Sequence, residues 1–88
     1  MKVIKTREQA LDVIKGSECF ALEHNMWSVV IFHKDMITQD VCCEVSYFDD
    51  SFRKECFLQN TKDHLKEAKV DCAIYLGTAC MFSQGMLF

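Results

Sequence analysis

The chain has 88 residues, of which half are hydrophobic, and it carries a formal net charge of −3. This length allows one α+β domain spanning residues 1–88, with a core of modest size. Ten Lys and Arg against thirteen Asp and Glu lack the basic excess of a nucleic-acid-binding protein or of a protein attracted to anionic lipid. We therefore expect neither a nucleic acid nor a membrane as partner.

Six cysteines are the most unusual feature of the composition, and none of their spacings matches a zinc site or a redox dithiol. They are Cys19, Cys42, Cys43, Cys56, Cys72 and Cys80. The first residues lack the apolar stretch of a signal peptide, and no window reaches the roughly 18 apolar residues of a membrane span. We expect a cytoplasmic protein whose reduced thiols behave as small hydrophobic groups.

The first elements expected along the chain are a short strand at residues 2–5 and a helix at about residues 7–15. Thr6 and Gln9 have the spacing of a capping box, in which each side chain binds a free backbone N–H of the other residue. Gly16 favours the left-handed conformation that ends many helices. The sequence therefore predicts that the helix stops at Gly16.

A hairpin is predicted next, from Cys19–Leu22 and Trp27–Phe32. Both runs are rich in apolar residues, and Asn25 between them tolerates the positive φ of a tight turn. With Asn25 and Met26 as the turn, both faces of the hairpin are apolar. One face would pack on helices, and the other would need a second layer or a partner.

Residues 36–48 fit two interpretations. A strand at 41–48 agrees with the alternating apolar residues and the high β propensity of this stretch, whereas a four-residue apolar spacing also describes a helix face. We prefer the strand, because Asp49-Asp50-Ser51 resembles a new helix start. A second helix is predicted from Ser51 to about Lys69, with a break near Asn60-Thr61 as an alternative.

The last third of the chain is apolar. Cys72–Leu76 is a continuous apolar run typical of a central strand. The tail, residues 77–88, contains no charged side chain, whereas chain ends are usually polar and mobile. We expect this tail to dock on the rest of the domain or on a partner.

The expected element order indicates an α+β fold with a small antiparallel or mixed sheet and two helices on one face. A ferredoxin-like βαββαβ arrangement with an inserted strand is the concrete hypothesis. Folds of this type support many unrelated functions, so the fold alone does not identify one.

Residues that could carry chemistry do not form a recognised pattern. The three histidines are far apart in the expected elements, and no glycine-rich phosphate loop is present. We predict no enzyme activity, no metal and no cofactor. Cys56, close to Arg53 and Lys54, is the best candidate for a redox-sensing thiol, and Cys19, Cys72 and Cys80 are predicted to be buried and inert.

The apolar surplus favours a protein-binding function, because Trp, Met and Phe are enriched at interface centres. The predicted partner-binding residues are Met26, Trp27, Met81, Phe82, Met86, Leu87 and Phe88. The leading hypothesis is a small non-catalytic regulator, inhibitor or adaptor that binds a protein partner or a second copy of itself, as a homo-oligomer. The alternatives are a homodimeric domain that binds a small hydrophobic ligand, and a thiol-based sensor.

Overall fold

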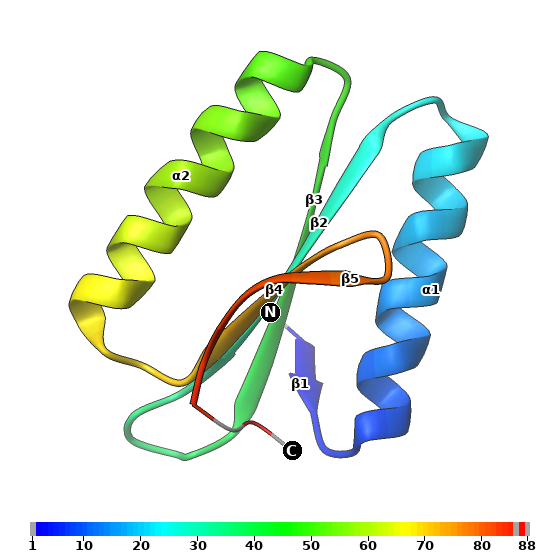
Figure 1. Cartoon of the computed structure of the whole chain (residues 1–88). Helices are drawn as coiled ribbons and strands as arrows, with labels where there is room; N and C mark the ends of the chain where they lie inside the picture. Colours follow the sequence, from blue (N-terminus) through cyan, green and yellow to red (C-terminus); the bar gives the residue numbers. More distant parts are fainter. Residues whose placement is uncertain (1, 86, 88) are drawn as a thin grey trace.

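The computed structural model describes residues 2–85 and 87, which form two helices and one five-stranded sheet (Figure 1). The elements in chain order are β1 (Lys2–Ile4), α1 (Arg7–Glu23), β2 (Trp27–Lys34), β3 (Val41–Phe48), α2 (Ser51–Ala68), β4 (Cys72–Leu76) and β5 (Ala79–Gln84). All neighbouring strands are antiparallel, in the order β1-β3-β2-β4-β5. The predicted α+β class is confirmed. Neither described helix is long and apolar enough to cross a bilayer.

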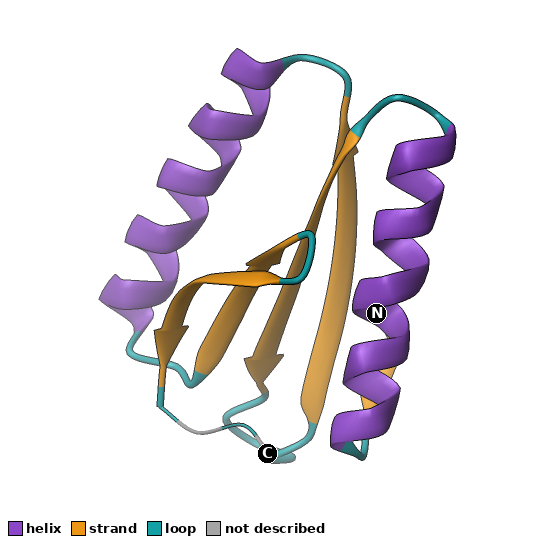
Figure 2. Cartoon of the chain, turned by 45° about the vertical axis from the view of Figure 1, so that its right-hand side comes forward, coloured by secondary structure: helices purple, strands orange, loops and turns teal. Residues whose placement is uncertain are grey.

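The sheet lies between the two helices, so the domain has three layers (Figure 2). Side chains of β2 point alternately to the two faces, as in any strand. Val30 and Phe32 belong to the core formed with α1, whereas Val29 and Ile31 belong to a second core formed with α2. The expectation of two helices on one face is therefore wrong, and the apolar second face of β2 is covered by α2.

The connections between strands explain this placement. The helix α1 joins β1 to β2 past β3, and α2 joins β3 to β4 past β2. Both helix connections cross the sheet in the same direction. The strands from which they start, β1 and β3, are antiparallel to each other. Connections of this kind are nearly always right-handed. Two crossovers of the same hand that start from antiparallel strands place their helices on opposite faces of the sheet. The ferredoxin-like arrangement would instead return the last strand to the side of β1, which this sheet order excludes.

The helix α1 begins as the sequence predicts and ends eight residues later than expected. The capping box between Thr6 and Gln9 is present. The helix continues through Gly16 because its buried side extends further along the chain. Its buried residues are Ala10, Ile14, Ser17 and Ala21, at the spacing of one helix face. The buried Ser17 hydroxyl donates to the Ile14 carbonyl at 2.9 Å, so its polar group is satisfied.

The predicted strand at Cys19–Leu22 is therefore the last part of α1. Asn25 has the expected positive φ of 53°, but it ends a helix and does not turn a hairpin. The Met26 N–H donates to the Ala21 carbonyl at 2.8 Å and the Asn25 N–H to the Leu22 carbonyl at 3.4 Å. This pair of bonds is the Schellman motif.

The second half of the fold follows the predictions more closely. Residues 41–48 form the strand β3, and α2 begins after Asp50, whose carboxylate accepts from the Arg53 N–H at 3.1 Å. The helix passes through Asn60-Thr61 without a break and ends at Lys69, which has a positive φ of 57°.

The strand β4 has the predicted bounds, and residues 79–84 of the apolar tail dock on the domain as expected. Residues Ala79–Gln84 of that tail form β5, an edge strand paired with β4. The register between them shifts at Ile74/Tyr75, where β5 contains a bulge. Edge strands often carry such bulges because the added twist hinders pairing with other chains.

Candidate protein-binding surface

The loop between β2 and β3, residues 35–40, is held by six internal hydrogen bonds. One oxygen of the Asp35 carboxylate accepts from the N–H groups of Ile37 and Thr38, at 2.8 and 2.9 Å. The Asp35 N–H donates to the Asp40 carbonyl at 2.8 Å and closes the loop. Gln39 takes the positive φ, 63°, that the reversal of the chain requires. The loop is therefore a defined structure.

Two large apolar side chains project from this loop into solvent. Met36 is 73% exposed and Ile37 is 92% exposed, the highest value among the large hydrophobic residues of the described chain. Single exposed apolar residues are common on protein surfaces, but two adjacent ones on a hydrogen-bonded loop form a ready contact. We name this pair, Met36 and Ile37, the loop tip.

The electrostatics of the loop agree with its geometry. Hydrogen bonds from the backbone N–H groups of Thr38 and Ile37 lower the pKa of the Asp35 carboxyl below its ordinary value. They do so because they stabilise the ionised form. At neutral pH the carboxylate is therefore charged and able to hold both N–H groups.

The loop tip was not among the residues predicted from the sequence. A weak signal was present, because an Asp side chain often accepts a hydrogen bond from the backbone two residues later, in an Asx turn. No feature of the sequence predicts that Met36 and Ile37 are exposed, since apolar residues next to a strand are buried as often as they are exposed.

Among the predicted partner-binding residues, Met26 and Trp27 lie at the end of β2 opposite to the loop tip. They line a depression of about 270 Å³ together with residues of α1 and β4, which include Leu22 and Leu76. Trp27 is 41% exposed. The ammonium group of Lys54, on α2, lies 5.1 Å from the centre of the Trp27 ring, within the range of a cation–π contact.

The other predicted residues belong to β5 and the end of the chain. Met81 is exposed. Phe82 is half-buried against the α2 core, and Leu87 is half-buried against the α1 core. Met86 and Phe88 lie outside the described residues. The structure thus brings Met26 and Trp27 together and places Met81 elsewhere, on the far strand of the sheet.

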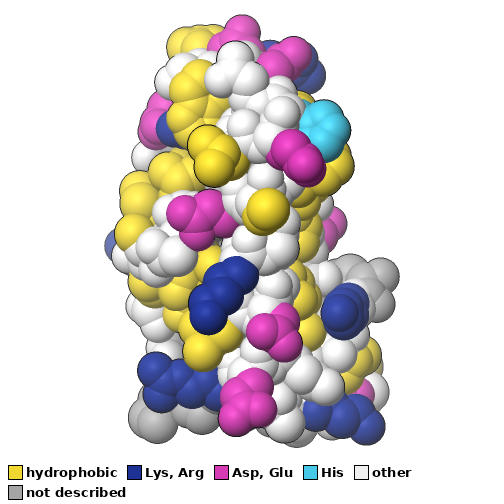
Figure 3. All heavy atoms as spheres, turned by 90° about the vertical axis from the view of Figure 1, so that its right-hand side faces the viewer, with side chains coloured by type: hydrophobic (Ala, Val, Ile, Leu, Met, Phe, Trp, Pro, Cys, Tyr) yellow, Lys and Arg dark blue, Asp and Glu magenta, His cyan; other side chains and the backbone are white. Residues whose placement is uncertain are grey.

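The surface contains more apolar groups than these. Nine large hydrophobic residues of the described chain are exposed. On the side of the molecule that carries α1, apolar side chains lie in several groups between charged ones (Figure 3). Leu11, Phe20 and Leu22 are the large exposed apolar residues of that helix. The excess of apolar side chains inferred from the composition is therefore present at the surface.

The cysteines divide equally between surface and interior, and all six are free thiols. Cys72 is buried as predicted, whereas Cys19 and Cys80 are exposed, which corrects the expectation for both. The correction for Cys19 follows from the longer α1, whose outer side carries it. Burial raises the pKa of the Cys43 and Cys72 thiols. Cys56 is exposed, as a sensor would require.

The histidines do not assemble a metal site in the part of the chain that is described. No group of three or more His, Cys, Asp or Glu side chains there is placed to hold an ion. His33 and His64 do line one groove between α2 and the sheet, with Glu44. Nothing in the sequence predicts that these two residues lie at one groove, because their shared position depends on how α2 packs on the sheet.

Comparison with known proteins adds no further guide, since no family model, no curated protein and no solved structure matches the chain.

Proposed function

We propose that this chain is a small non-catalytic protein-binding module, and that the loop tip is its main contact. The observation that carries the proposal is the exposure of Met36 and Ile37 on a loop fixed by six hydrogen bonds. The expected partner is a protein with an apolar pocket, which is either a different protein or a second copy of this chain.

Rigidity of the loop favours binding. A flexible segment loses conformational freedom when it binds, and this loss weakens the complex. The hydrogen bonds of Asp35 fix residues 37 and 38 before any partner arrives, so little further ordering is needed. Burial of a Met or Ile side chain contributes about 1.5–3 kcal/mol, which makes two adjacent anchors a substantial part of a protein interface.

Retrieval of partners with a tagged protein from an extract of the source organism tests the proposal. The double variant Met36→Gln/Ile37→Thr removes apolar surface while it leaves every loop hydrogen bond in place. The matched control is Phe52→Gln, because Phe52 is 76% exposed but lies at the start of α2. A protein retained by the wild type and the control, and lost by the double variant, is the expected result.

Binding to such a protein should weaken by about tenfold or more for each substitution, given the burial energies above. Light scattering after size exclusion tests whether the partner is a second copy of this chain. If it is, the wild type should be a dimer and the double variant a monomer. A wild type that is monomeric and retains no protein specifically, or retains the same proteins as the double variant, contradicts the proposal.

A further inference from the structure

The strand β5 is the outer strand on one side of the sheet. It comes last in the strand order and, among the described strands, it pairs only with β4. Figures 1 and 2 both show β5 in front of the other strands, with neither helix in front of it. Most of its residues are exposed, and Met81 is 47% exposed. The outer edge of such a strand presents backbone N–H and C=O groups with which another strand can pair.

The two edges of the sheet differ in their protection against such pairing. Natural edge strands are often very short or carry lysines, which oppose contact with another strand. The strand β1 has three residues, of which Lys2 is one, and Lys5 follows it directly. In contrast, β5 has six residues, and residues 77–88 contain no charged side chain. Two copies of β5 can therefore lie side by side without repulsion between like charges on the strands.

The bulge in β5 limits this pairing to part of the strand. The register with β4 skips Met81 and is regular again for the next three residues, Phe82–Gln84. A bulge disturbs pairing at its own position, so these three residues form the part of β5 that can receive a straight strand. We name Phe82–Gln84 the edge segment.

The backbone groups of Ser83, the middle residue of the edge segment, point away from β4. Burial raises the pKa of the Cys72 thiol, although a hydrogen bond from the backbone N–H of Gln84 lowers it. Cys72 belongs to β4, so the N–H of Gln84 is directed toward that strand. Because successive residues of a strand direct their N–H and C=O groups to opposite edges, those of Ser83 face outward.

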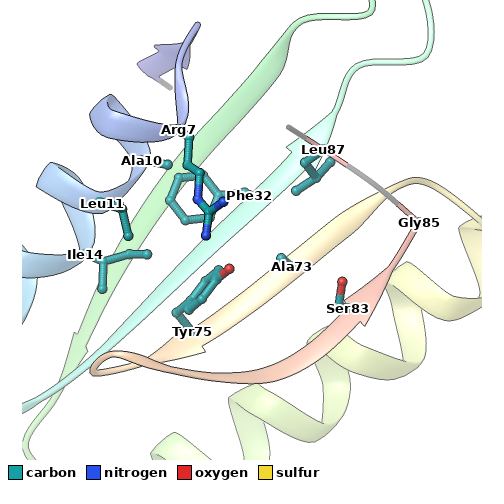
Figure 4. Close-up of a pocket in the computed structure, with 10 residues that line it drawn as sticks. All are labelled: Arg7, Ala10, Leu11, Ile14, Phe32, Ala73, Tyr75, Ser83, Gly85 and Leu87. Atoms are coloured by element: carbon teal, nitrogen blue, oxygen red, sulfur yellow. The ribbon is translucent and has the colours of Figure 1, made fainter.

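The side chain of Ser83 leaves room for a second strand. It is exposed and lines a cavity of about 230 Å³ between α1 and the β4–β5 side of the sheet, which Arg7 also lines. Figure 4 shows its hydroxyl on the same side of the sheet as the Tyr75 ring, above the face and not across the edge. Two serines that lie opposite each other on neighbouring strands can also form a hydrogen bond.

We propose that two copies of this chain pair through the edge segment as antiparallel strands, with Ser83 of one copy opposite Ser83 of the other. Each Ser83 N–H donates to the C=O of the other Ser83, and Phe82 lies opposite Gln84. The contact has twofold symmetry, so both copies use the same groups. The two five-stranded sheets then form one continuous sheet. This inference is independent of the protein-binding proposal, because the loop tip takes no part in the contact.

Sedimentation equilibrium of the wild type between about 10 µM and about 1 mM tests the proposal. The paired segment is short, and small interfaces are weak, so we expect a Kd of about 100 µM. Ser83→Lys and Ser83→Glu each place like charges opposite each other, and each should weaken the dimer by about fivefold or more. An equimolar mixture of the two variants should associate at least as tightly as the wild type, because opposite charges then meet.

The variant Val3→Lys is the matched control. It adds the same charge to an exposed residue of the other edge strand, β1, and should change the Kd by no more than about twofold. The loop-tip variant Met36→Gln/Ile37→Thr should dimerise as the wild type does, which separates this contact from a second copy bound at the loop tip. Circular dichroism shows whether each variant is folded.

Hydrogen exchange of the wild type is a second measurement, and it needs no variant. With the expected Kd, the monomeric fraction at about 1 mM is about one quarter of that at about 20 µM, so the Ser83 amide should exchange about fourfold more slowly at the higher concentration. The Gln84 amide is directed toward β4 within its own chain, and its exchange should not depend on concentration.

Five results would overturn the proposal. The first is a wild type that stays monomeric at about 1 mM, ten times the expected Kd, which is also the result expected if the edge segment pairs with a strand of a different protein. The others are equal losses in Ser83→Lys and Val3→Lys, a mixture of the two Ser83 variants that associates no better than either alone, a dimer lost in the loop-tip variant, and exchange of the Ser83 amide that does not depend on concentration.

Discussion

Asp35 fixes the β2–β3 loop through one carboxylate oxygen that accepts hydrogen bonds from two consecutive backbone N–H groups. The pKa of Asp35 is lowered by these bonds, so the ionised side chain stabilises the loop at every pH above its unfolded-state value of about 3.9. This stabilisation is lost as the pH falls through the lower pKa of the folded state.

We predict that the amide signals of Ile37 and Thr38 shift together in an NMR titration, with a midpoint below about 3.9. The variant Asp35→Ala should remove the titration and speed hydrogen exchange at both amides at neutral pH. Asp35→Asn is the control, because its side-chain oxygen still accepts hydrogen bonds but does not titrate. Unchanged exchange in Asp35→Ala would show that the loop does not depend on this carboxylate.

The thiols give a second prediction at the scale of single residues. Thiolates are the reactive form of cysteine, and access and a low pKa both favour reaction. Cys19, Cys56 and Cys80 are exposed, and the other three cysteines are buried. At pH 8, a coloured disulfide reagent should modify three thiols quickly and the remaining three at least about tenfold more slowly.

Variants Cys19→Ser, Cys56→Ser and Cys80→Ser should each remove one fast thiol. Unfolding in denaturant should make all six equally fast. A fast phase that belongs to Cys56 alone would favour the thiol-sensor hypothesis, and three similar rates would argue against it. Six fast thiols in the folded protein would contradict the burial described above.

Gly16 matters at the scale of secondary structure, because it lies within α1 where the sequence predicts its end. Gly in a helix interior costs about 0.5–1 kcal/mol relative to Ala. A Cβ atom built on Gly16 meets no atom within 4 Å apart from the adjoining residues and the backbone of its own helix. Gly16→Ala should therefore raise the free energy of unfolding by about 0.5–1 kcal/mol, measured by urea denaturation.

Gly85 provides the matched control. Its φ of 80° is unfavourable for any residue with a side chain, and a Cβ there would collide with the Asp71 carboxylate. Gly85→Ala should destabilise the protein by about 1 kcal/mol or more. A stability loss in Gly16→Ala would mean that the helix is interrupted at this residue.

Local signals explain which elements could be predicted. The Thr6 capping box, the Asp50 helix start and the apolar run Cys72–Leu76 each depend on neighbouring residues, and each is confirmed. The end of α1 could not be predicted from Gly16, because packing of Ala21 on the sheet extends the helix. The positive φ of Asn25 was predicted correctly. Its role was not, because a hairpin turn and a helix end use the same positive φ.

The candidate site was less predictable than the fold. Met36 and Ile37 were part of a segment with two interpretations, and their exposure depends on where the loop lies in the folded chain. The cavity near Arg7 likewise depends on the position of β5, which was predicted from the sequence only as part of a docked tail. Both features arise from contacts between distant segments, for which a single sequence contains no local signal.

The whole molecule is organised around β2, which lies in the middle of the sheet and between both helices. Val29 and Val30 point to opposite faces, and each has no exposed surface. Val29→Ala and Val30→Ala should each lower the free energy of unfolding by about 2 kcal/mol, from two lost methyl groups and the remaining space.

Val3→Ala is the control for these two variants, because Val3 lies on the edge strand β1 and is 43% exposed. Its effect should remain within about 0.5 kcal/mol. Chemical denaturation of the three variants measures these values. A near-neutral result at Val29, together with a large loss at Val30, would indicate that α2 does not cover its face of the sheet.

The enclosure of β2 also restricts how this chain can change over generations. From Val29 to Phe32, four consecutive side chains are buried, two under each helix, so a polar replacement at any of them would be left without water or a partner. Mutational drift in this tetrapeptide is confined to exchanges among apolar residues of similar volume. The outer sides of the helices carry no such restriction and can diverge until descendants share little beyond that interior segment.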